Sequence, residues 1–224
     1  MKTIDVAAGG HAMRLHLSAA GGSLPLGFIN DDLEAGDGVA ALLEDLPLNI
    51  AIVDPGQWTD ALSPWPEPAL NEKMGDFGGG GSELISDYRN SIIPRAEKLV
   101  GIKPPFRVIA GYSLAGLWGI YAGWESCLFE RVAAASASLW YEGFLDYLRT
   151  KTPSASLRRV QLSLGDREER AKNPRLARIG AATLEAKEIM NEKGVAAELV
   201  MTEGGHFNNA ASRMADTIRA AITR

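Results

Sequence analysis

The chain of 224 residues has almost no cysteine and no long apolar run. Its single cysteine, Cys127, cannot form a disulfide within the chain, and no Cys/His spacing typical of a metal site is present. No apolar run approaches the roughly 18 residues of a membrane span, and the first residues lack the apolar stretch of a signal peptide. These absences predict a cytoplasmic protein with no metal and no membrane partner.

The charge is weakly acidic and is not concentrated anywhere. The net charge is −5 and no cluster of lysine and arginine stands out, so we expect no nucleic-acid partner. With 46% hydrophobic residues, a chain of this length can bury one substantial core. We therefore expect residues 1–224 to form a single domain, and the composition leaves open whether copies of it form a homo-oligomer.

A serine between two small residues stands at the most informative position in the chain. The sequence Gly-Tyr-Ser-Leu-Ala-Gly at residues 111–116 follows an apolar run at 106–110 and precedes an apolar segment that is typical of a buried helix. A nucleophile elbow has this order, because a tight turn between strand and helix leaves no room for large side chains near the serine. The pattern predicts that Ser113 is a nucleophile. The alternative is a strand-to-helix turn in which Ser113 only caps the helix.

Apolar periodicity predicts strands that alternate with helices from residue 24 onward. The first two expected strands alternate weakly between apolar and polar residues, a pattern that is typical of half-exposed antiparallel strands. The expected strands are 2–6, 13–18, 24–29, 48–53, 106–110, 129–137, 157–164 and 196–202. The expected helices are 38–45, 83–101 with a kink or break at Pro94, the elbow to about 125, 143–149, 173–193 and 208–223. We therefore predict an α/β fold with a mostly parallel central sheet, antiparallel N-terminal strands and helices on both faces.

Reactive side chains follow three of these strands, at the sheet edge where α/β proteins carry their chemistry. In chain order they are Ser113, the acidic loop 166–169 and His206. Serine, acid and histidine is the order found in α/β-hydrolases. His11 and His16 lie in the N-terminal strands, where we expect exposed positions. Three residues of the acidic loop could orient the histidine: Asp166, Glu168 and Glu169.

From about residue 24 to its end, the chain resembles the esterase family that includes esterase D and the enterochelin esterases. The resemblance lies in Gly-Tyr-Ser-Leu-Ala-Gly at 111–116, Ser-Ala-Ser-Leu-Trp at 136–140, Ser-Leu-Gly-Asp-Arg-Glu at 163–168 and Gly-Gly-His-Phe at 204–207. It implies the α/β-hydrolase fold and a serine esterase. In many such enzymes the acid lies three positions after the glycine that ends its strand. The resemblance thus favours Glu168 as the acid, with Asp166 second and Glu169 a solvated charge.

An oxyanion hole requires two N–H groups aimed at the tetrahedral intermediate. The first is expected from Leu114, and the second from Asn30 or Asp31 after the third strand. No Gly-rich oxyanion motif of the lipase type is present to fix the second donor.

Residues 54–82 lack periodicity and contain two tryptophans among prolines. We expect this segment to face the substrate, with Trp58, Trp65, Tyr112 and Trp140 forming an aromatic wall suited to an acyl or aryl group larger than acetyl. The alternative is a loop that its tryptophans only pin to the core.

These expectations combine into a serine hydrolase that cleaves small-molecule carboxylic esters or thioesters through an acyl-enzyme and needs no cofactor. An acyltransferase would use the same residues, so the sequence does not separate the two. A binding protein on a retained hydrolase fold is the third interpretation, and it predicts that Ser113 does not react with a fluorophosphonate.

Overall fold

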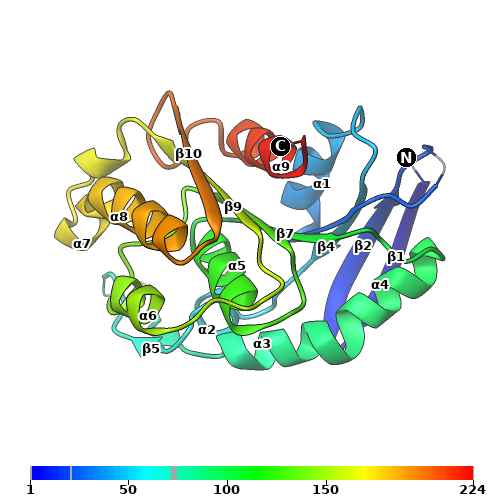
Figure 1. The fold of residues 1–224 in the computed structure, drawn as a ribbon, viewed down its shortest axis with the longest axis horizontal. Coiled ribbons are helices and arrows are strands. Elements are labelled where there is room, and N and C mark those ends of the chain that lie inside the picture. The colour runs from blue at the N-terminus through cyan, green and yellow to red at the C-terminus, as the bar shows by residue number, and fades with distance from the viewer. Residues whose placement is uncertain (1, 21, 72–74, 224) are drawn as a thin grey trace.

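The computed structural model describes residues 2–20, 22–71 and 75–223. Eight of the strands in this part form one sheet in the order β1-β2-β4-β3-β7-β8-β9-β10 (Figure 1). They are β1 (Lys2–Ala8), β2 (His11–Leu17), β3 (Leu26–Asn30), β4 (Asn49–Val53), β7 (Arg107–Tyr112), β8 (Arg131–Ala135), β9 (Arg159–Gly165) and β10 (Ala196–Thr202). β2 runs antiparallel to β1 and β4, and all other neighbours are parallel. The predicted fold class is confirmed.

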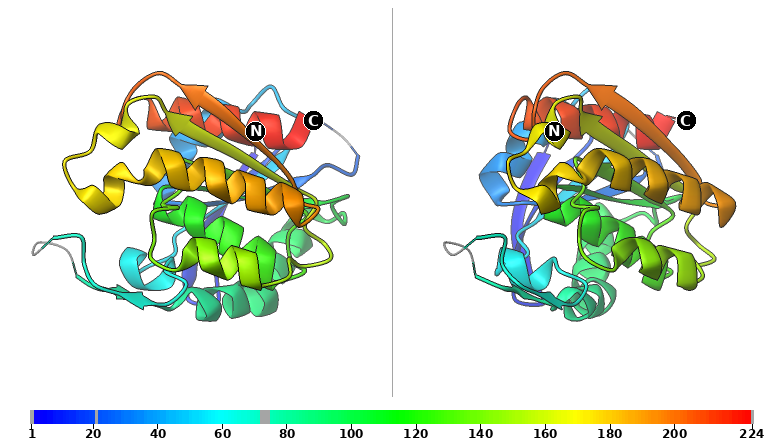
Figure 2. Two further views of the ribbon diagram at one scale, coloured as in Figure 1. Left: turned by 60° about the vertical axis from the view of Figure 1, so that its left-hand side comes forward. Right: turned by 90° about the vertical axis from the view of Figure 1, so that its left-hand side faces the viewer.

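Helices cover both faces of the sheet (Figures 1 and 2). On one face lie α1 (Leu33–Ala41) and α9 (Ala210–Thr223), which pack on the central strands. The opposite face is covered by α3 (Gly81–Asp87), α4 (Ile93–Val100), α5 (Leu114–Glu125), α6 (Phe144–Thr150) and α8 (Ile179–Glu192). Both faces of the central strands are therefore buried, which is why those strands are continuously apolar in the sequence.

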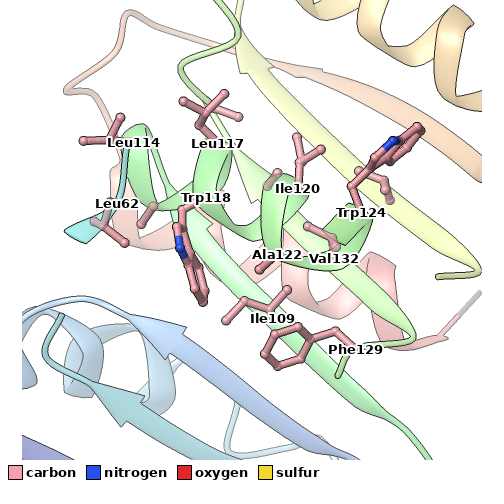
Figure 3. Close-up of a cluster of buried hydrophobic side chains, with 14 of the residues drawn as sticks. Leu62, Ile109, Leu114, Leu117, Trp118, Ile120, Ala122, Trp124, Phe129 and Val132 are labelled. Atoms are coloured by element: carbon pink, nitrogen blue, oxygen red, sulfur yellow. The ribbon is translucent and has the colours of Figure 1, made fainter. Parts of the chain in front are cut away.

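Helix α5 runs through the larger of the two cores (Figure 3). Trp118 and Trp124 are almost completely buried on it, and Ile109 and Val132 of the neighbouring strands pack beside the same helix. A helix that is apolar on all sides is stable only when it is enclosed on all sides. Its N-terminus, which follows Ser113, is consequently held in a fixed position relative to the sheet.

Two helices depart from their expected bounds for identifiable local reasons. α1 begins at Leu33 instead of residue 38, because the Asp32 carboxylate caps it by accepting the backbone N–H groups of Glu34 at 3.1 Å and Ala35 at 2.9 Å. The helix expected at 173–193 is interrupted at Arg178, giving α7 (Pro174–Ala177) and α8. Asn173 caps α7 by accepting the N–H of Arg175 at 2.9 Å.

The segment expected as one helix at 83–101 contains a π-helical turn, η1 (Tyr88–Ile92), between α3 and α4. Pro94 has no N–H to donate to the preceding turn, and the widened turn directly before it accommodates the missing hydrogen bond. In the described helices, no apolar stretch is long enough to cross a bilayer.

The described residues of the segment 54–82, which are 54–71 and 75–82, contain regular structure. The segment contains the short helix α2 (Trp58–Ala61) and a hairpin of β5 (Pro66–Glu67) and β6 (Phe77–Gly78). The indole N–H of Trp65 donates to the carbonyl of Glu142 at 3.1 Å. The Trp65 ring packs against Tyr141, Phe144 and Tyr147. Trp65 therefore pins the segment to the core.

The expectation that His11 and His16 are exposed is wrong. Each side chain is only 14% exposed, because each ring is held by an aspartate from a helix packed on the N-terminal strands. His11 Nε2 lies 3.1 Å from Asp87, and His16 Nε2 lies 2.7 Å from Asp37. These two pairs fasten the antiparallel end of the sheet to its helices.

Candidate active site

The turn between β7 and α5 has the backbone geometry of a nucleophile elbow. Ser113 has φ 56° and ψ −118°, a conformation that side-chain-bearing residues adopt only under strain. A Cβ atom at Gly111 would lie 2.3 Å from the backbone of Ala115, and one at Gly116 would lie 2.9 Å from the carbonyl oxygen of Gly111. Both glycines are therefore required by the close approach of strand and helix, and the strained turn projects Ser113 at the edge of the sheet.

A continuous line of hydrogen bonds joins Ser113, His206 and Glu168. The hydroxyl oxygen of Ser113 lies 3.0 Å from Nε2 of His206, and Nδ1 of His206 lies 2.7 Å from Oε2 of Glu168. A carboxylate can only accept, so Nδ1 carries the proton and Nε2 is free to accept from the serine hydroxyl. The structure thus brings together the three residues expected to form the catalytic line.

Glu168 is buried, and it is held by donors on both oxygens. Its side chain is 2% exposed. Oε1 accepts from the Ser136 hydroxyl at 2.6 Å and from the backbone N–H of Gly165 at 2.8 Å. Burial alone would raise the pKa of Glu168, but the hydrogen bonds from His206, Ser136 and Gly165 outweigh it and hold the pKa below its ordinary value. The carboxyl is therefore ionised at neutral pH and can orient the imidazole.

The other two acids of the same loop have different surroundings. The carboxylate of Asp166 accepts the backbone N–H of Gly204 at 2.8 Å, so it braces the loop that carries His206 without touching the ring. Glu169 is exposed. Of the three alternatives left by the acidic loop, Glu168 is the one in contact with the histidine.

The candidate oxyanion donors differ in availability. Leu114 is the first residue of α5, so its backbone N–H has no partner one turn earlier in the helix. The N–H of Asp31 donates to the carbonyl of Val53 at 3.2 Å, which commits it to the sheet. Asn30 is the last residue of β3, and its side-chain oxygen accepts from the hydroxyl of Tyr88. Leu114 as the first donor and Asn30 as the second remain predictions.

A cavity of about 610 Å³ opens beside Ser113 and His206. This is a size typical of small-molecule sites. Most of its wall is apolar and consists of Leu70, Trp140, Ala171, Leu176, Ile179 and Phe207. Polar atoms are contributed by Asn71 and Asn173 and by the Ser113–His206–Glu168 line. The cavity is therefore a mostly apolar space whose wall includes the Ser113–His206–Glu168 line.

The four aromatic residues expected in the wall are distributed differently. Trp140 lines the cavity. Trp58 is 36% exposed on α2, and Trp65 packs in the core; neither is among the cavity-lining residues. Tyr112 does not line the cavity either, and its hydroxyl instead donates to the carbonyl of His206 at 2.6 Å. Of the four expected wall residues, Trp140 alone lines this cavity, and the rest of its described wall includes residues 70–71, Leu176 of α7 and Ile179 of α8.

The sequence patterns did not identify two residues of this site, Ser136 and Arg213. Ser136, at φ 47°, donates to Glu168, and its strained backbone lies directly after β8. Arg213 donates from Nη1 to Glu168 Oε1 at 2.9 Å although its side chain is only 1% exposed. The available signal for Arg213 was a charged residue at helical spacing from Thr217 and Ala221 on the buried face of α9.

Comparisons with known proteins agree with this arrangement at the level of the fold. No protein-family model matches the sequence. The protein of Bacillus subtilis (strain 168) named uncharacterized protein YbbA is 28% identical over 187 residues, which are 79% of this chain and 75% of that protein. The siderophore hydrolase EstB from Aspergillus nidulans has a TM-score of 0.72 at 13% identity, with 99% of this chain and 94% of that chain covered.

The enterochelin esterase from Shigella flexneri has a TM-score of 0.68 at 16% identity, and the match covers 99% of this chain and 56% of that chain. At such identities a structural likeness establishes the fold and not the substrate. The chain has the α/β-hydrolase fold. The resemblance to the family of esterase D and the enterochelin esterases, inferred from the sequence motifs, is confirmed at the level of the fold.

Proposed function

We propose that this chain is a serine hydrolase that cleaves carboxylic esters or thioesters through an acyl-enzyme on Ser113. The observation that carries the proposal is the hydrogen-bonded line from Ser113 through His206 to the buried carboxylate of Glu168. These side chains come from three separate loops at one sheet edge, and an apolar cavity opens beside them. A binding site alone would not need a strained serine aligned on an imidazole.

The reaction follows from the positions of the protons. His206 Nε2 accepts the hydroxyl proton as Ser113 Oγ attacks the substrate carbonyl, and Glu168 stabilises the imidazolium that forms. His206 then gives this proton to the leaving oxygen or sulfur, and the acyl group stays on Ser113. In the second step His206 accepts a proton from a water molecule, which attacks the acyl carbonyl. The bond from the acyl carbon to Ser113 Oγ then breaks, and His206 returns the proton to Ser113.

The negative charge that develops on the carbonyl oxygen needs donors that are already in place. The N–H of Leu114 at the start of α5 is the first donor in this proposal, and the positive end of the helix dipole supports it. We propose Asn30 as the second donor, because it lies at the carboxyl end of β3 beside β7.

The wall of the cavity indicates which part of the substrate it receives. Leu70, Leu176, Ile179 and Trp140 line the cavity and would contact an apolar group of the substrate. We therefore assign the cavity to an apolar acyl or aryl group larger than acetyl. Such a substrate would gain binding free energy in proportion to the apolar surface that the cavity wall removes from water.

Activity-based labelling tests the proposal. A fluorophosphonate probe is expected to label the protein at Ser113, as located by peptide mass spectrometry. Ser113→Ala is expected to lose both the label and the hydrolysis of p-nitrophenyl esters. The matched control is Ser86→Ala, which changes an exposed serine on α3 and is expected to retain both.

Each result has a distinct meaning. Unchanged ester turnover in Ser113→Ala would refute the role of Ser113. A protein that is folded by circular dichroism but resists the probe and cleaves no ester would instead favour a binding protein on a hydrolase fold.

A further inference from the structure

The guanidinium of Arg213 lies behind the proposed acid, at the centre of the edge where the site loops meet. Its Nη1 lies 2.9 Å from Glu168 Oε1, 2.8 Å from the Ser136 hydroxyl and 2.6 Å from the Tyr112 hydroxyl. The Arg213 side chain is 1% exposed. Because a buried guanidinium is costly to desolvate, it persists only where its N–H groups find acceptors, as they do here.

The other two nitrogens of the same group hold the segment that carries His206. Nε donates to the Thr202 hydroxyl at 2.7 Å, and Nη2 donates to the carbonyls of Glu203 at 3.4 Å and Gly205 at 3.3 Å. Tyr112 completes the arrangement, since its hydroxyl accepts from Arg213 and donates to the carbonyl of His206. One side chain thus connects the carboxyl ends of β7, β8, β9 and β10.

The charge of Arg213 also balances that of Glu168. The buried guanidinium of Arg213 and the carboxylate of Glu168 together carry no net charge. The imidazole of His206, in its neutral form, therefore lies beside an ion pair whose charges cancel. Without Arg213, the Glu168–His206 pair would carry a net charge of −1 in a buried place. Loss of a neighbouring positive charge makes the pair take up a proton at higher pH, whichever of the two residues holds that proton.

We propose that Arg213 is a positioning residue, which clamps Glu168 and the loop of His206 into one geometry and whose charge favours the state with an ionised Glu168 beside a neutral His206 imidazole. This proposal rests on the proposed serine-hydrolase function. It assigns no contact between Arg213 and substrate, since Arg213 is not among the residues that line the cavity.

Other ionisable groups surround this network and bear on its pH dependence. The Tyr112 phenol faces Arg213 from β7, and burial raises the pKa of that phenol. Asp216 of α9 lies near Arg213 around a small cavity of about 40 Å³. Asp166 binds the Gly204 N–H in the loop that Arg213 also holds. None of these groups replaces the direct contact of Arg213 with Glu168.

The test compares Arg213→Met, Arg213→Lys and the unmodified protein in the pH dependence of p-nitrophenyl ester hydrolysis. In Arg213→Met, kcat is expected to fall about 100-fold, because the site loses its fixed geometry. KM is expected to stay within about threefold, since no substrate contact is removed. The midpoint of the acid limb of kcat/KM is expected to rise by about 1 to 2 pH units.

Lysine keeps the charge but cannot reproduce the fork of donors. Arg213→Lys is therefore expected to keep the acid limb in place while kcat falls about tenfold. A purely structural role would lower kcat equally in both variants without moving the limb. If Arg213→Met does not fold, Arg213→Lys carries the test, and full kcat in that variant overturns the clamp.

Arg219→Met is the matched control. Arg219 lies on the same helix, at the surface, where it pairs with Asp45 at 2.6 Å. Its replacement is expected to change neither kcat nor the acid limb. An equal shift of the acid limb in Arg213→Met and Arg219→Met would mean that the shift does not arise from the contact of Arg213 with Glu168.

A second measurement separates this inference from the proposed function. The ring nitrogens of His206, labelled with 15N, report its protonation by NMR without any substrate. A titration midpoint that rises in Arg213→Met supports the clamp even if no ester is cleaved. Coincident titrations in Arg213→Met and the unmodified protein refute the clamp, whatever the outcome for hydrolysis.

Discussion

Glu168 Oε2 lies 2.7 Å from Nδ1 of His206, whereas the carboxylate of Asp166, two positions earlier, binds the backbone N–H of Gly204 at 2.8 Å. Two acids in one loop therefore act on the same histidine segment in different ways. Glu168 holds the ring itself, and Asp166 holds the backbone that leads to it.

This difference predicts unequal effects of two similar substitutions. Glu168→Gln presents a neutral amide to His206, so it no longer stabilises the imidazolium, and kcat is expected to fall about 1000-fold. Asp166→Asn keeps an oxygen that can accept the Gly204 N–H, so kcat is expected to change less than about fivefold. Steady-state kinetics on one p-nitrophenyl ester measure both. A larger loss in Asp166→Asn than in Glu168→Gln would reverse the assignment of the acid.

The elbow predicts that two glycines differ in their tolerance of alanine: Gly111 in β7 and Gly119 in α5. A Cβ at Gly111 would lie 2.3 Å from the backbone of Ala115, so Gly111→Ala is expected to lower the free energy of unfolding by more than about 2 kcal/mol and to abolish activity. At Gly119 the nearest atom, Val132 Cγ1, is 3.5 Å away. Gly119→Ala is expected to raise stability by up to about 1 kcal/mol, because alanine favours the helix.

Chemical denaturation of the two variants measures this contrast. The explanation of the elbow by close packing fails if Gly111→Ala unfolds at the same denaturant concentration as the unmodified protein.

Much of the candidate site could be predicted from local sequence because its three candidate catalytic residues each follow a strand. The strand, the small residues and the helix around Ser113 fix its position by local sterics, and parallel strands bring their carboxyl ends to one edge. The loops after β7, β9 and β10, which carry the serine, the acid and the histidine, therefore meet at this edge, and this can be expected without any knowledge of packing. The choice of Glu168 over Asp166 needed the family resemblance, because periodicity does not tell which side chain of a turn points inward.

The parts that could not be predicted depend on contacts between distant segments. Trp65 is fixed by Tyr141, Phe144 and Tyr147, which follow it by more than 70 residues, so nothing near it in the sequence shows that it faces the core. Arg213 has the same difficulty. A charged side chain on a helix is usually solvated, and its burial becomes evident only when the acceptors from β7 to β10 are in place.

Asp31, directly after β3, makes stability depend on pH. Burial raises the pKa of its carboxyl from 3.8 to about 6, so the folded state disfavours the charged form. Stability is then greatest below the unfolded-state pKa and declines as pH rises toward 6. Asp31→Asn cannot ionise. At pH 7.5 the free energy of unfolding of this variant is expected to exceed that of the unmodified protein by about 1 to 2 kcal/mol. The partial solvent exposure of the Asp31 carboxyl keeps the gain in this range.

The same comparison at pH 4 supplies the internal control. There the two proteins are expected to differ by less than about 0.5 kcal/mol, because the carboxyl is largely protonated in the folded state. Urea unfolding at both pH values gives the difference. An equal gain at pH 4 and pH 7.5 would show that the substitution acts through packing and not through ionisation.

The apolar cavity predicts that one side chain on α7 sets the length of the acyl group. Leu176 lines the cavity and is only partly buried, so Leu176→Trp adds volume there without displacing a core residue. The kcat/KM for p-nitrophenyl octanoate is expected to fall at least tenfold relative to that for the acetate, on the order of what a filled pocket costs a longer chain. Leu184→Trp is the matched control, because Leu184 is 53% exposed on α8 and lies outside this cavity. Kinetics on esters of two to ten carbons compare the variants. A uniform loss across all chain lengths in Leu176→Trp would mean that the cavity does not receive the acyl group, since the acetyl ester would then be as sensitive to the added ring as the octanoyl ester.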